Sequence, residues 1–202
     1  MHKESGSCGD YAVATLQTNA IVPEGMGVDG HYHVVCRDKD GNVKWEEGFP
    51  NLVVAGGKQL MLDTLLRTSG TYTTVGPFLG LTNASLTPAA TDTMTTLVGG
   101  GKEFTAYTVG GSAVRGTAVF GASSSTGTTP SNVTTSTATA ITYTITGGGG
   151  TVYGCFLVTG SGAVSTQSST AGTLYSEGNF STAKTTTAGD TVSVTYSTTA
   201  TS

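Results

Sequence analysis

Apolar and polar residues alternate along two segments in the C-terminal part of the chain. In residues 140–146, Ile141, Tyr143 and Ile145 alternate with threonines, and residues 190–196 repeat the pattern with Val, Val and Tyr. A period of two residues places successive side chains on opposite faces of a β-strand. Both segments are therefore predicted to be strands with one face against a core.

A β-hairpin is predicted over residues 31–49. Residues 31–37 and 43–49 have the composition of strands, and Asp38-Lys39-Asp40-Gly41-Asn42 between them has that of a turn. The Asp-Gly pair supplies the positive φ that tight turns need. Trp45, the only tryptophan, lies on the return strand and is expected to anchor core packing.

Other segments with the composition of strands complete a set of about eight. They are residues 75–81, 103–109, 113–120, 151–159 and 173–176. Residues 151–159 are apolar on both faces, as in a central strand. The connections at 86–97 and 123–137 are long and polar, which favours a jelly roll or Greek key over a meander. We expect an all-β, antiparallel, jelly-roll-like sandwich over residues 31–202.

One segment, residues 58–67, has helical spacing instead. Leu62, Leu65 and Leu66 recur three and four positions apart, and Ser69-Gly70 follows as an end signal. We expect one short helix here, plugging the open end of the sandwich.

Residues 1–30 keep neither period and are predicted to form an extended N-terminal arm. The pattern fits an arm that lies on a partner, and equally a terminus without fixed contacts. In the first case the contacting residues would be the apolar ones, which are Tyr11, Val13, Leu16, Ile21 and Val22.

Charge is sparse and unevenly distributed. Charged residues make up 11% of the chain, against a usual ~25%, and after Gly116 only Glu177, Lys184 and Asp190 are charged. Free monomers normally keep a charged surface for solubility. The distribution therefore favours a subunit whose faces are covered by neighbours, including copies of itself in a dimer or trimer.

The same composition argues against several partners. The net charge is −4 and the nine basic residues are scattered, whereas nucleic-acid binding needs clustered Lys and Arg. No segment approaches the ~20 apolar residues of a membrane span. The first residues lead into no apolar signal region, so we expect synthesis in a cytoplasm, with Cys8, Cys36 and Cys155 reduced.

Candidate ligand sets are incomplete. His31 and His33 share a strand face, but a zinc site needs a third ligand and the remaining histidine is His2. The acids of the 38–42 turn begin like a calcium loop, yet Phe49 stands where that loop requires Glu. We expect no metal or cofactor.

Candidate catalytic groups are also missing. Glu46 and Glu47 are neighbours on a strand and point to opposite faces, and Glu103 lies far away in sequence. The glycines at 99–101 precede Lys102 without the spacing of a phosphate loop. No nucleophile–base pair is recognisable, so we expect no enzymatic activity.

A series of segments has a recognisable order. The turn-and-strand motif at 38–47 is followed by Asn51-Leu52-Val53-Val54 and the Leu-rich helix, then by Phe78-Leu79-Gly80-Leu81 before a Thr-rich loop. Residues 151–157, 173–176 and 188–192 complete it. This order resembles a family of small virion proteins of tailed bacteriophages, the capsid decoration or cement proteins.

The resemblance implies a jelly-roll-like virion structural protein that binds the capsid exterior. It would bridge and stabilise subunits of the major capsid protein, with the arm as a candidate capsid contact. The alternative is a tail or head-fibre component involved in host attachment, although no internal repeat is present. A small β-sandwich hydrolase and a secreted adhesin are weaker alternatives, because a catalytic pair and a signal are missing.

Overall fold

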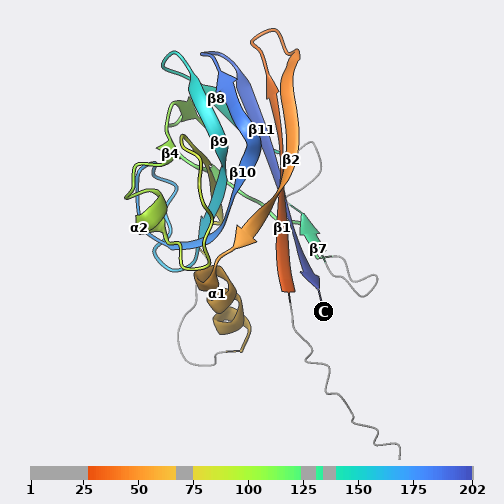
Figure 1. The fold of residues 1–202 in the computed structure, drawn as a ribbon, viewed down its shortest axis with the longest axis vertical. Coiled ribbons are helices and arrows are strands. Elements are labelled where there is room, and N and C mark those ends of the chain that lie inside the picture. Colours follow the sequence, from red (N-terminus) through yellow and green to blue (C-terminus); the bar gives the residue numbers. More distant parts are fainter. Residues whose placement is uncertain (1–26, 67–74, 124–130, 134–139, 202) are drawn as a thin grey trace, which may run out of the picture.

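The computed structural model describes residues 27–66, 75–123, 131–133 and 140–201, and Figure 1 shows their arrangement. Long antiparallel strands form two layers that face each other across an apolar core. The helix α1 lies at one end of this sandwich, and the turn between β1 and β2 lies at the other.

The elements follow one another along the chain as β1 (Gly27–Arg37), β2 (Val43–Val53), α1 (Ala55–Leu66), β3 (Phe78–Thr82), α2 (Met94–Leu97), β4 (Glu103–Phe104), β5 (Tyr107–Thr108), β6 (Gly116–Thr117), β7 (Ser131–Val133), β8 (Ile141–Ile145), β9 (Gly150–Thr159), β10 (Thr173–Thr186) and β11 (Thr191–Thr201).

The strands pair in the order β4-β3-β9-β10-β2-β1-β11-β8-β5, with β6 beside β3 and β7 beside β11. All pairs are antiparallel, and β2 joins the layers because its first part pairs with β1 and its last residues pair with β10. Early strands pair with late ones in nested fashion: β1 with β11, β2 with β10, β3 with β9. This nesting is that of a jelly roll, so the predicted all-β antiparallel sandwich with a short helix is confirmed.

The alternating segments behave as predicted. Ile141, Tyr143 and Ile145 of β8 are buried while their threonine neighbours are exposed. The corresponding side chains of β11 are also buried. Strand β9 lies between β3 and β10 and is buried along most of its length, as expected of a central strand.

Tyrosine hydroxyls connect the two layers. Tyr143 of β8 donates a hydrogen bond of 2.7 Å to the carbonyl oxygen of Leu79 in β3. The hydroxyl of Tyr32 in β1 lies 2.9 Å from the hydroxyl of Ser176 in β10. Both rings are fully buried, so these bonds satisfy polar atoms that would otherwise be costly in the core.

Several predicted boundaries are wrong. Strand β1 begins at Gly27, because the C-terminal part of β11 continues far enough to pair with it, so residues 27–30 do not belong to an arm. Residues 1–26, with the predicted contact residues, lie outside the described chain. Helix α1 begins at Ala55 instead of residue 58, and Gly57 lets it approach Tyr175, whose carbonyl oxygen would lie 2.6 Å from a Cβ at that position.

The connection at 86–97 is not simply a polar loop. It contains α2 and buries Leu86, Met94 and Leu97 against the outer face of β9 and β10. A second apolar cluster therefore covers the side of this layer that faces away from the main core.

Trp45 is a lesser core residue than predicted. Its ring is only partly buried, packs edge-on against Phe180, and donates a hydrogen bond of 3.3 Å to the carbonyl oxygen of Thr185. The large, fully buried side chains of the main core are instead those of four tyrosines, which are Tyr32, Tyr107, Tyr143 and Tyr196.

Candidate functional site

Helix α1 presents two apolar rows. Residues three and four positions apart share a helix face. Leu60, Met61 and Leu65 line a groove beside the sandwich, whereas Leu62 and Leu66 are not among its lining residues. The exposed fractions of Leu62, Leu65 and Leu66 are 48%, 80% and 70%. Within the described part of the chain, the predicted plug therefore leaves these three leucines exposed, and an exposed apolar face of this kind is typical of an interaction site.

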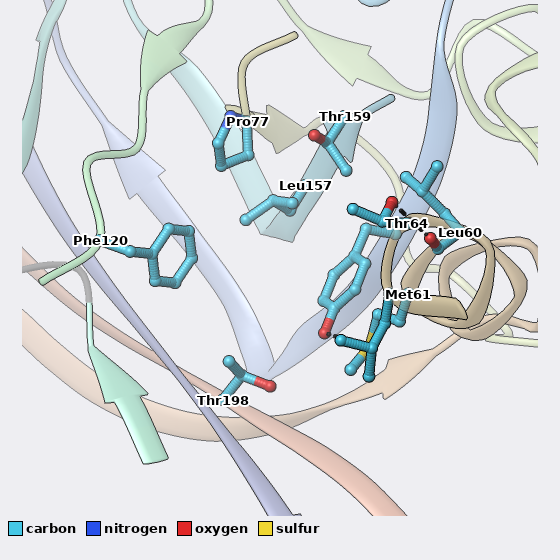
Figure 2. A pocket seen from close by; sticks show the side chains of 10 residues that line it. Leu60, Met61, Thr64, Pro77, Phe120, Leu157, Thr159 and Thr198 are labelled. Atoms are coloured by element: carbon cyan, nitrogen blue, oxygen red, sulfur yellow. Dashed lines mark hydrogen bonds between the residues drawn. The ribbon is translucent and has the colours of Figure 1, made fainter. Parts of the chain in front are cut away.

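The groove lies between α1 and the open end of the sandwich, and Figure 2 shows it. Its volume is about 560 Å³, within the range of ligand and peptide sites. No charged side chain of the described chain lines it. The lining residues are Leu60, Met61, Thr64, Leu65, Pro77, Phe120, Leu157, Thr159, Tyr175 and Thr198.

Tyr175 provides the main polar atom on the α1 side of this groove. Its hydroxyl donates to the Sδ atom of Met61 at 3.4 Å, which ties β10 to the helix (Figure 2). Burial raises the pKa of Tyr175 above its usual value, although a hydrogen bond with Thr198 acts in the opposite direction. The hydroxyl therefore stays protonated at neutral pH and acts as a neutral contact.

The charges after Gly116 are all withdrawn from the surface or paired. Asp190 is buried and accepts a hydrogen bond of 2.5 Å from Lys44, and Lys184 lies 2.7 Å from Glu47. Glu177 is only 2% exposed. The outer surface formed by the described part of the C-terminal half thus carries almost no free charge.

Glu177 forms a second, polar site with Asp92. Both line a small pocket of about 100 Å³ together with Lys102 and Thr96. Burial, followed by the hydrogen bond with Asp92 and its charge, raises the pKa of Glu177 to about 8. Burial also opposes ionisation of Asp92, but hydrogen bonds from Glu177, Ala89 and Thr96 outweigh it and lower that pKa. At neutral pH the pair therefore holds one proton, on Glu177.

This pair predicts a dependence of stability on pH. The folded chain holds the Glu177 proton more tightly than the unfolded chain, whose pKa is near 4.5. The stability that this group confers is therefore full below about pH 4.5 and is lost as the pH rises through about 8. Glu177→Gln keeps a neutral donor to Asp92 at every pH, so we expect it to flatten this decline in the melting temperature.

Thermal unfolding between about pH 4.5 and pH 8 measures the effect. Asp40→Asn is the matched control, because it also removes one carboxylate, from an exposed turn, and should keep the wild-type slope. A slope unchanged in Glu177→Gln would show that Glu177 is already ionised in the folded chain.

The histidines and turn acids do not gather into a ligand set. Within the described residues, no three His, Cys, Asp or Glu side chains lie together as a metal site would require. His33 contacts Glu46 at 2.9 Å on the exposed strand face. The carboxylate of Asp38 accepts the backbone N–H groups of Asp40 and Asn42, both at 2.9 Å, which is the bonding of a turn.

The remaining acid candidates form ion pairs. Glu103 is buried and binds Arg115 in a two-pronged arrangement, with Nε to Oε1 and Nη2 to Oε2 both at 2.8 Å. The Arg115 guanidinium also donates to the carbonyl oxygen of Ser169 and lies over the ring of Phe156. With every charged oxygen bonded, this cluster holds the 103–115 segment against β9 and is structural.

The buried thiols are unreactive. Cys36 and Cys155 are free and buried. Burial, with the Asp190 charge, raises the pKa of Cys36 to about 11, and burial raises that of Cys155 further. Neither supplies a thiolate at neutral pH. Cys8 lies outside the described residues.

Comparison with models of protein families, with curated proteins and with solved structures finds no match to this chain. Neither helix of the described chain has the length and apolar character needed to cross a membrane.

Sequence reasoning missed both sites. The groove draws side chains from six separate segments, so no local motif marks it. The spacing of the three leucines of α1 predicts a helix face that plugs the sandwich, whereas the structure leaves them exposed. Asp92 and Glu177 are far apart in sequence and meet only because the 86–97 segment folds over β10.

Proposed function

We propose that this chain is a structural subunit of a tailed-bacteriophage virion. It binds the outside of the capsid as a decoration or cement protein and bridges subunits of the major capsid protein. The observation that carries the proposal is the exposed apolar end of the molecule, where Leu62 and Leu66 of α1 face water.

Two further features support an assembled subunit over a free monomer. The C-terminal half presents almost no free charge, so close contact with neighbours requires little desolvation of ions. The order of segments resembles that of decoration proteins. Many weak contacts repeated by symmetry then provide the strength of attachment.

The contact is tested with capsids of the parent phage that lack the protein. Purified chain is added, and sedimentation measures the bound fraction. We expect Leu62→Ser combined with Leu66→Ser to weaken binding by about a hundredfold or more, since the two leucines together bury apolar area worth about 3–6 kcal/mol. Decorated heads should also lose DNA at a higher temperature than undecorated heads.

Val43→Ser is the matched control. Val43 is 49% exposed, and it follows the β1–β2 turn at the end of the sandwich opposite α1 (Figure 1). It should bind like the wild type. Equal binding of the double-leucine variant would exclude α1 as the contact. Equal heat resistance of the two kinds of heads would reject the cement function, and labelled protein seen on the tail would favour the fibre alternative.

A further inference from the structure

The described residues do not close the main core at the end of the sandwich where α1 lies. The groove beside α1 is lined by Leu157 of β9 and Thr198 of β11, which belong to opposite layers, so it opens between them (Figure 2). Phe120 and Tyr175, at its walls, pack against the main core. Water in an apolar space of about 560 Å³ is unfavourable, so an apolar occupant would stabilise this end.

The sequence outside the described residues narrows the choice of occupant. The segments 67–74, 124–130 and 134–139 consist almost entirely of Thr, Ser and Gly, with Tyr72 as their only large apolar side chain. Residues 11–22 instead contain Tyr11, Val13, Leu16, Ile21 and Val22, and no charged residue. They match the uncharged, apolar lining of the groove.

The described chain begins beside the groove. Gly30 pairs with Thr198, a lining residue, and Gly27 is three residues further along the strand, about 10 Å away. The five peptide steps from Val22 to Gly27 span up to about 17 Å. The connector at 23–26 is therefore long enough to turn back and place Val22 in the groove of the same molecule. A short tether of this kind gives a high effective concentration.

We propose that residues 11–22 occupy the groove of their own chain and complete the apolar core at this end. Ile21 and Val22 enter first, between the layers, and the groove-facing row of α1 covers the segment from outside. Leu65 then contacts the segment, whereas Leu66 does not. The apolar arm residues thus belong to the protein's own fold rather than to a capsid contact, and the outward Leu62 and Leu66 stay available to a partner.

The test uses the free full-length protein, so it does not depend on capsid binding. The Leu65 side chain is 80% exposed among the described residues, and the proposed segment would cover it. We therefore expect Leu65→Ser to lower the melting temperature by about 2–4 °C. Ile21→Ser with Val22→Ser should lower it similarly. The variant that carries all three substitutions should have a melting temperature no lower than that of the less stable of these two variants, since both of them break the same contact.

Two matched controls fix the interpretation. Leu66→Ser changes the same residue type one position along the helix, outside the groove, and Thr15→Ser with Thr18→Ser changes polar positions of the segment. Both should leave the melting temperature near the wild-type value. Equal shifts for Leu65→Ser and Leu66→Ser, or additive shifts in the triple variant, would overturn the proposal. Shifts that vanish on dilution, with a dimer in light scattering, would place the segment in a second copy instead.

Discussion

Replacing Arg115 with methionine is expected to destabilise the folded chain by about 3–5 kcal/mol. Arg115 is 1% exposed and is the largest fully buried side chain of the described residues. Its removal leaves the Glu103 carboxylate in the core, where the N–H of Ser168 at 2.7 Å is its one remaining hydrogen-bond donor among the described residues. A buried charge without its partner costs far more than an exposed ion pair contributes.

Urea unfolding followed by far-ultraviolet circular dichroism measures this loss. The control is the double variant Arg115→Met with Glu103→Leu, which removes both charges and should recover much of the stability. If both variants lose the same amount, the cost comes from packing around Phe156 and not from the unpaired carboxylate.

Tyr143→Ala is expected to cost about 3–5 kcal/mol, because it removes a fully buried ring from the centre of the core. The ring packs edge-on against Tyr107, with centroids 4.8 Å apart, and its hydroxyl bonds to Leu79 of the opposite layer. The loss therefore combines a cavity with a broken connection between layers.

Tyr143→Phe separates these two contributions. It keeps the ring and removes only the hydrogen bond to Leu79, so it should cost about 0.5–1.5 kcal/mol, the net contribution of a typical hydrogen bond. Equal unfolding free energies for Tyr143→Phe and the wild type would show that this connection between layers adds nothing to stability.

Period-two patterns were sufficient to predict the half-buried strands. In β8 and β11 one face packs against the core and the other faces solvent, so the alternation of apolar and polar residues in the sequence matches the alternation of buried and exposed positions. Strand β10 was predicted to be only four residues long. Its continuation past Ser176 contains Glu177 and Asn179, whose polar side chains contact Asp92 and Leu86 and hide the strand pattern.

Helix α1 is a case in which the sequence pattern predicts the element but not its burial. Its leucines have the spacing of a buried face, and local spacing does not reveal whether a surface exists to receive them. The groove and the Glu177–Asp92 pair could not be predicted for the same reason. Each is assembled from distant segments that come together through nested, long-range strand contacts. Such contacts are set by the whole fold and not by neighbouring residues.

The β1–β2 turn has a consequence for engineering. The turn is closed locally by the Asp38 carboxylate, and it lies at the end of the sandwich farthest from α1 (Figure 1). A foreign peptide inserted between Asp40 and Gly41 would point away from the apolar end. If each copy attaches to a shell through α1 as proposed, its inserted peptide would face outward, and the chain would serve as a scaffold for multivalent antigen display.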